Sequence, residues 1–187
     1  ALMEDAAARL RSEGCTRWRL NVRPENTPAV ELYRSLGLEQ VHASASLRFD
    51  WEIVDALPRG ETRLRVSPIG EAGRIATEAR FDLPRGQLAK LAQTDGVEVR
   101  TLVDPDRPER LDLGVAAFDL GFPGCFPFRV GRSEWGVELL RGLRPLARLS
   151  TMGVVAEDDA RLETMLIDAG AEVLLRFVLL AGALVDP

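Results

Sequence analysis

The stretch LNVRPENTPAVELYRSLGLE, residues 20–39, decides the fold because it joins a strand directly to a helix. Apolar and polar residues alternate over residues 16–22, which predicts a strand. Thr27 is expected to cap the helix, and Pro28 to be its first residue, since the fixed φ and missing N–H of proline cost nothing there. Gly37 supplies the left-handed turn that ends the helix. The apolar positions of this helix are Ala29, Leu32, Tyr33 and Leu36.

The same order of elements occurs twice in the chain. A helix is predicted over residues 1–14, before the quoted stretch, and a long strand over residues 41–51 follows it. The last third of the chain repeats helix, strand, helix and strand, and its final strand is apolar enough to predict burial on both faces. These four elements are expected at residues 134–146, at 148–156, after a cap at Asp158 or Asp159, and at 172–185.

A shift of 133 residues superposes the two copies without a gap. The apolar positions of the helices coincide, which predicts an internal repeat. Tyr33 falls on Leu166 and Asn26 falls on Asp159, so a hydroxyl and a carboxamide of the first copy are absent from the second. This pattern is expected when one copy keeps a chemical site and the other keeps only the fold.

Composition excludes several classes of function. The chain has 187 residues, 46% of them hydrophobic and 28% charged, which is typical of a soluble globular protein. A net charge of −5 argues against a broad nucleic-acid-binding face. The longest apolar stretch, residues 177–185, is too short to span a bilayer. Cys15 and Cys125 lie far apart and give no metal spacing or disulfide framework, so a cytoplasmic location is expected.

The spacing of the quoted stretch resembles a motif of the GNAT superfamily of acetyl-CoA-dependent N-acetyltransferases, V-x-x-x-N-x-x-A-x-x-L-Y-x-x-x-G-F. This sequence has Leu38 where the family usually has an aromatic residue. The resemblance implies an α+β fold, a mixed sheet with flanking helices, of the tandem-domain type. The matching residues are Val22, Asn26, Ala29, Leu32, Tyr33 and Gly37.

The resemblance implies roles for two of these residues. Asn26 would lie near the pantetheine arm of acetyl-CoA. Tyr33 would point toward the thioester sulfur and, as coenzyme A departs, either protonate it as the catalytic acid or stabilise its negative charge. An amine attacks the thioester directly in most of the family, so the resemblance implies acetyl-CoA as co-substrate and no metal. On residue type alone, Tyr33 reads as a core residue with its hydroxyl at the rim, and Asn26 as a capping or turn residue.

The chain also departs from the family pattern. In the family a Gly-rich loop precedes the helix that is predicted here at residues 1–14, and its N–H groups hold the cofactor pyrophosphate. The expected domains are therefore residues 1–51, the C-terminal half of a first copy truncated at its N-terminus, and residues 52–187, a second and degenerate copy. The second phosphate loop should lie in residues 128–135, where only Gly131 and Arg132 suit that role.

Two other stretches of the second copy leave alternatives open. The aromatic stretch of residues 121–128 is expected to be a buried turn, with a substrate-facing loop as the alternative. The acidic run of residues 157–159 is expected at a helix N-terminus, which attracts carboxylates, rather than at a metal site.

The sequence therefore predicts an N-acetyltransferase with its site in the first copy. The alternative is a non-catalytic pseudo-acetyltransferase module that serves binding or assembly. The acceptor would be a small-molecule or peptide amine: an antibiotic, a polyamine, an amino acid or a protein N-terminus. No nucleic acid or membrane partner is expected, and the family resemblance implies a homodimer.

Overall fold

The computed structural model describes residues 2–60 and 63–184, and these form two compact units. Unit 1 comprises the chain up to Ser44 together with the residues from Leu175 onward, and unit 2 is Ala45–Leu174. Two long strands, β2 (Glu39–Asp50) and β8 (Glu172–Ala183), run through the division between the units. The order of hydrogen-bonded strands is β1-β8-β2-β7-β6-β5-β4-β3.

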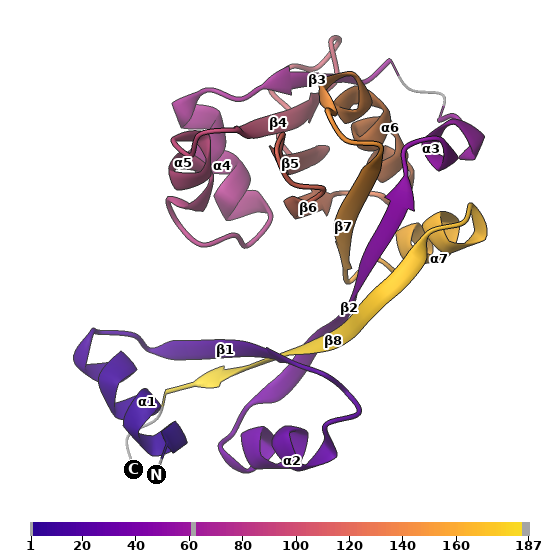
Figure 1. Cartoon of the computed structure of the whole chain (residues 1–187). Helices are drawn as coiled ribbons and strands as arrows, with labels where there is room; N and C mark the ends of the chain where they lie inside the picture. The colour runs from indigo at the N-terminus through magenta and orange to yellow at the C-terminus, as the bar shows by residue number, and fades with distance from the viewer. Residues whose placement is uncertain (1, 61–62, 185–187) are drawn as a thin grey trace. The chain divides into compact units, whose positions relative to one another are not determined.

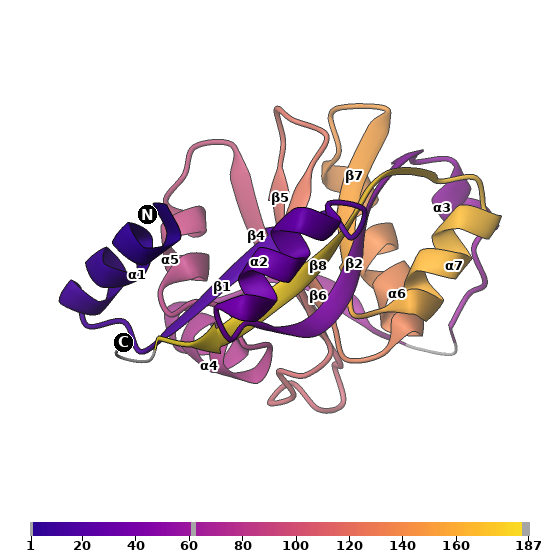
Figure 2. The ribbon, with the colours of Figure 1, turned by 90° about the horizontal axis from the view of Figure 1, so that it is seen from below.

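Unit 1 is built on three neighbouring strands, β1, β8 and the first part of β2. The helix α2 lies across one face of these strands, as Figures 1 and 2 show from two directions. β1 and β8 are antiparallel, and Leu20 pairs with Leu180 and Val22 with Val178 on the face toward α2. Besides β2 and β8, unit 1 contains α1 (Leu2–Ser12), β1 (Arg17–Val22) and α2 (Thr27–Ser35).

Unit 2 contains the rest of the sheet and most of the helices (Figure 1). Its strands β3 to β6 are joined antiparallel, whereas β6 and β7 are parallel. Its elements are α3 (Ile53–Ala56), β3 (Arg65–Pro68), α4 (Glu71–Arg80), α5 (Gln87–Ala92), β4 (Val97–Val103), β5 (Gly114–Asp119), β6 (Cys125–Val130), α6 (Ser133–Leu143), a 3-10 turn (Arg144–Leu146), β7 (Thr151–Glu157) and α7 (Ala160–Asp168).

The sheet of unit 2 is covered on both faces because its central strands alternate between two apolar clusters. Val115 and Ala117 of β5 pack with Leu88 of α5 on one face. Ala116 of the same strand packs with Leu139 of α6 on the opposite face. Successive side chains of a strand point to opposite faces, so a strand that is apolar at every position requires helices on both sides. The predicted α+β fold with flanking helices is thereby confirmed.

The repeat predicted from the sequence has a structural counterpart. The bounds of α7 and β8 lie 133 residues after those of α2 and β2. The glycines that follow the two helices also correspond, since both have a positive φ, +80° at Gly37 and +111° at Gly170. The compact units cut across β2 and β8, so they do not test the predicted division into residues 1–51 and 52–187, which stays a prediction.

Several local predictions were wrong. Asn26, not Thr27, caps α2, because its side-chain oxygen reaches the N–H of Ala29. Leu32 is exposed, whereas Val30 carries the buried position of that helix. β8 was expected to be buried on both faces, but only Val178 and Leu180 of its residues are buried. An apolar composition therefore overstated the burial of this strand.

We expect the helix α6 to contribute most to the stability of unit 2, since it buries Leu139, Leu140 and Leu143 completely. Replacing Leu139 with alanine should lower the free energy of unfolding by about 3 kcal/mol, because it removes buried methyl groups and leaves a cavity. Urea denaturation measures this change. The matched control is Leu149→Ala, at an exposed position of the same unit, which should cost about 0.5 kcal/mol or less. Equal losses in the two variants would contradict the assignment of the core.

Candidate functional site

Tyr33 lies on α2 and is half-buried against the small core of unit 1. Its neighbours in that core include Val30 of the same helix and Leu38 of the turn that follows it. The Tyr33 hydroxyl makes no hydrogen bond within the described part of the chain. The ring is therefore fixed by packing while the hydroxyl stays available to a ligand.

Asn26 is exposed at the start of α2. Its side-chain oxygen accepts a hydrogen bond from the backbone N–H of Ala29 at 3.3 Å. Because the oxygen is used by the cap, the carboxamide NH₂ group is the part left to contact a ligand. The capping reading that residue type alone favoured is thus confirmed, and a ligand contact by the NH₂ group stays a prediction.

The helix brings Asn26 and Tyr33 to one side but keeps them apart. Seven residues separate them, and a rise of 1.5 Å per residue puts them about 10 Å apart along the helix. A single small group cannot contact both side chains at that separation. An extended ligand that runs along α2 can.

A pocket of about 230 Å³ lies on the neighbouring face of α2, and no pattern in the sequence predicted it. Val30, Glu31 and Arg34 of the helix line it, with Val178 of β8 at its apolar side. Tyr33 is not among its lining residues. The pocket would have been hard to predict, because it needs β8, whose position beside α2 is a long-range feature of the fold.

The strands β6 and β7 of unit 2 run parallel to each other. The two strands are in register at one pair of described residues, Cys125 and Val154. Beyond that pair, Arg129 of β6 forms an ion pair with Glu157 of β7. Both side chains are largely buried, so this pair occupies the space where the two strands continue. Burial also raises the pKa of the Cys125 thiol, so it is protonated and no nucleophile.

The starts of α6 and α7 are bonded directly to each other. The Ser133 hydroxyl donates a hydrogen bond to the Asp159 carboxylate at 2.7 Å. The same carboxylate oxygen accepts the N–H of Leu162 at 2.9 Å and so caps α7. Asp159 therefore places a negative charge between the two helix N-termini, where an anionic ligand would otherwise be attracted.

Gly131, the glycine of the expected second phosphate loop, is explained by packing. A Cβ at this position would lie 2.2 Å from the carbonyl oxygen of Asp112, which only glycine avoids. Its N–H donates to the carbonyl oxygen of Leu113 at 3.1 Å and is not free for a phosphate. The residues at the start of α6 therefore do not fit the pyrophosphate of acetyl-CoA.

The two open alternatives of the second copy have different outcomes. The aromatic stretch of residues 121–128 is not a buried turn, since Phe122 is 64% and Phe126 51% exposed. The acidic run lies at a helix N-terminus, as predicted, where Glu157 pairs with Arg129 and Asp159 caps α7. In residues 2–60 and 63–184 no group of three or more His, Cys, Asp or Glu side chains could hold a metal ion.

None of the helices in these residues is both long enough and apolar enough to cross a membrane.

Comparison with known proteins identifies the fold. Residues 1–38 match the model of a family described as the acetyltransferase (GNAT) family. No curated protein matches the chain. A functionally unknown conserved protein from Staphylococcus epidermidis superposes with a TM-score of 0.66 at 10% identity, over 96% of this chain and 77% of its own.

Two further structures carry the same fold. A GCN5-related N-acetyltransferase from Sphaerobacter thermophilus superposes with a TM-score of 0.54 at 15% identity, over 91% of this chain. This chain spans only 60% of that protein's length. A tandem GNAT protein from the clavulanic acid biosynthesis pathway superposes over the whole of this chain and 70% of its own, with a TM-score of 0.52 and 14% identity.

The ion pair between Arg129 and Glu157 should be a structural requirement of unit 2. The variant Glu157→Gln leaves the Arg129 guanidinium largely buried beside a neutral group, and it should lower the free energy of unfolding by about 2 kcal/mol. The matched control is Glu134→Gln, which breaks the more exposed pair of Glu134 with Arg161 and should cost about 0.5 kcal/mol or less. Urea denaturation compares the two variants. A loss no larger in Glu157→Gln than in the control would contradict a closed end of β6 and β7.

Proposed function

We propose that this chain, which has the fold of the GNAT superfamily and matches its family model over residues 1–38, belongs to an N-acetyltransferase with its site in the first copy. The observation that carries the proposal is the contrast between Tyr33 and its counterpart Leu166. Leu166 is fully buried, whereas Tyr33 is half-buried and keeps a free hydroxyl. Packing at this position of the helix does not require a hydroxyl, so its presence in one copy points to chemistry.

The proposed roles follow from what each side chain has available. Acetyl-CoA, when bound, supplies an activated thioester to an amine. The Tyr33 hydroxyl donates its proton toward the sulfur of the departing coenzyme A, where negative charge develops. The carboxamide NH₂ of Asn26 donates to a carbonyl of the pantetheine arm, since the carboxamide oxygen is already used by the cap.

The remaining parts of the proposal concern organisation and partners. Residues 1–51 would form the C-terminal half of the first copy, and residues 52–187 a second copy without a working cofactor site. The acceptor would be a small-molecule or peptide amine. A homodimer is proposed on the resemblance alone, and a cytoplasmic location on the two separate cysteines.

The alternative function is a non-catalytic module for binding or assembly. The ion pair of Arg129 with Glu157 and the hydrogen bond from Ser133 to Asp159 support it, because they involve residues near the expected cofactor site of the second copy. Calorimetric titration of the complete gene product with acetyl-CoA separates the two functions. Saturable binding supports the enzyme, and no binding at millimolar acetyl-CoA supports the module.

The variant Tyr33→Phe tests the catalytic role, since it keeps the ring and removes only the hydroxyl. In the complete gene product we expect kcat for acetyl transfer to fall at least about 100-fold, with the KM for acetyl-CoA within about twofold of the parent. The control is Leu32→Ala, an exposed position of the same helix, which should leave kcat unchanged. An unchanged kcat in Tyr33→Phe would refute the assignment.

A further inference from the structure

A second pocket, of about 470 Å³, lies in unit 2 between the loop that joins β4 to β5 and the start of α6. Its volume is in the range of small-molecule sites. The lining is dominated by charged side chains of both signs rather than by apolar ones. Those charged residues are Arg63, Arg107, Arg110, Arg132, Asp104 and Asp106.

Two of the four arginines are already neutralised by neighbouring carboxylates. Arg110 makes two hydrogen bonds to Asp112, at 3.0 and 2.7 Å. The Arg110 guanidinium lowers the pKa of Asp112, so the pair stays charged at neutral pH. Arg107 contacts the carboxylate of Asp104 at 3.3 Å.

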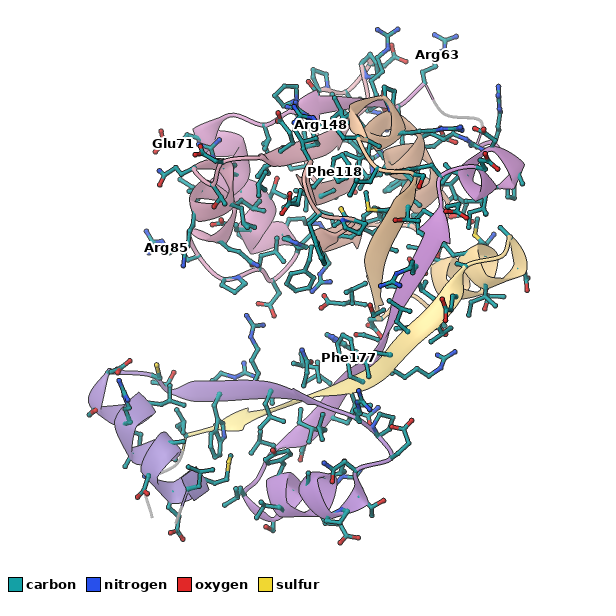
Figure 3. All side chains as sticks on the ribbon, viewed as in Figure 1. Arg63, Glu71, Arg85, Phe118, Arg148 and Phe177 are labelled. Atoms are coloured by element: carbon teal, nitrogen blue, oxygen red, sulfur yellow. The ribbon has the colours of Figure 1, made fainter. Side chains whose placement is uncertain are left out.

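The other two arginines have no such partner. Neither Arg63 nor Arg132 forms an ion pair with any residue in the described ranges. Both line the same pocket, which leaves their guanidiniums available to an anion. Figure 3 shows Arg63 at the end of unit 2 where α6 and β3 meet.

Trp135 fixes the position of one of these charges. The Arg132 guanidinium lies 5.0 Å from the centre of the Trp135 ring, and that of Arg110 lies 5.2 Å from it. Cation–π contacts of this kind hold an arginine in one orientation. Since Trp135 is buried and carries two guanidiniums, its ring is not available to stack on a base, which argues against a nucleotide.

The opposite wall offers an acceptor. The carboxylate of Asp104 is occupied by Arg107 and by the N–H of Asp106. The carboxylate of Asp106 makes no hydrogen bond or ion pair in the described part of the chain. It is exposed and lines the pocket, so it is free to accept a hydrogen bond from a hydroxyl group of a ligand.

We propose that this pocket binds a small phosphate monoester that carries hydroxyl groups. The phosphate lies between Arg63 and Arg132, whose guanidiniums match the geometry and the charge of about −2 of a phosphate at neutral pH. The hydroxyl groups of the ligand donate hydrogen bonds to the Asp106 carboxylate. Three carboxylates beside the arginines, together with a net charge of −5, disfavour a nucleic-acid backbone as the ligand.

Arg132 lies within residues 128–135, where the family resemblance implies the phosphate loop of the second copy. At the start of the same helix, the Ser133 hydroxyl is already bonded to Asp159. The pocket lies on the side of α6 toward the β4–β5 loop and depends on guanidiniums rather than on the helix N-terminus. The proposal therefore does not rest on acetyl transfer.

Isothermal titration calorimetry of the whole chain with glycerol 3-phosphate tests the proposal, with inorganic phosphate and glycerol as comparison ligands. We expect the ester to bind more tightly than inorganic phosphate, and glycerol not to bind. The variant Arg132→Gln should weaken binding of the ester at least tenfold, and Arg63→Gln should also weaken it. Asp106→Asn should weaken binding of the ester but leave binding of inorganic phosphate unchanged.

The matched control is Arg85→Gln. Arg85 is an exposed arginine on the α4–α5 side of the unit, away from Arg63 (Figure 3), so this variant should bind the ester as the parent does. Thermal unfolding shows whether each variant is folded, and if Arg132→Gln is not, the exposed position Arg63 provides the test. Three results would overturn the proposal. The first two are no binding of the ester at 10 mM, which is roughly the limit of a specific site, and binding of the ester no tighter than that of inorganic phosphate. The third result is binding as tight as in the parent when Arg132→Gln or Arg63→Gln is folded.

Discussion

The caps at the two strand-to-helix junctions are the constraint on which the rest of the structure depends. Asn26 and Asp159 each accept the N–H three residues ahead, and so fix where α2 and α7 begin. The turns of each helix then place Tyr33 and Leu166 at equivalent positions, and a glycine at positive φ ends each helix. Since both long strands start directly after these stops, a shift at either cap would displace the strand that follows.

The two caps have the same geometry, but the capping residues differ by a charge. The neutral Asn26 satisfies the cap and leaves an NH₂ group exposed. The negative Asp159 satisfies the cap and also binds Ser133, which joins α7 to α6. With Arg129 and Glu157 paired beside it, the second junction is filled by the protein's own side chains. The cap at Asp159 thus also joins two helices of unit 2.

Local features of the fold could be predicted from the sequence, and the long-range ones could not. Local patterns predicted the start of the final strand at residue 172 and a helix cap at Asp158 or Asp159, because both depend on neighbours in the chain. The cap of α2 was misplaced by one residue, since Asn26 and Thr27 both suit the position and only the reach of the side chain decides. The burial of β8 was overestimated, and the two pockets were missed, because each depends on elements distant in sequence. For the candidate site, the residue types of Asn26 and Tyr33 were evident from the sequence, whereas the use of the Asn26 oxygen by the cap was not.

The central claim is that one copy keeps a cofactor site and the other keeps only the fold. The stoichiometry of acetyl-CoA binding to the complete gene product tests it most directly, by calorimetric titration at a known protein concentration. One acetyl-CoA per chain is the result that the account predicts, unchanged when Asp159 is replaced with asparagine. Two acetyl-CoA molecules per chain would contradict it, because the second would have to lie where Arg129, Glu157 and Asp159 already fill the end of β6 and β7.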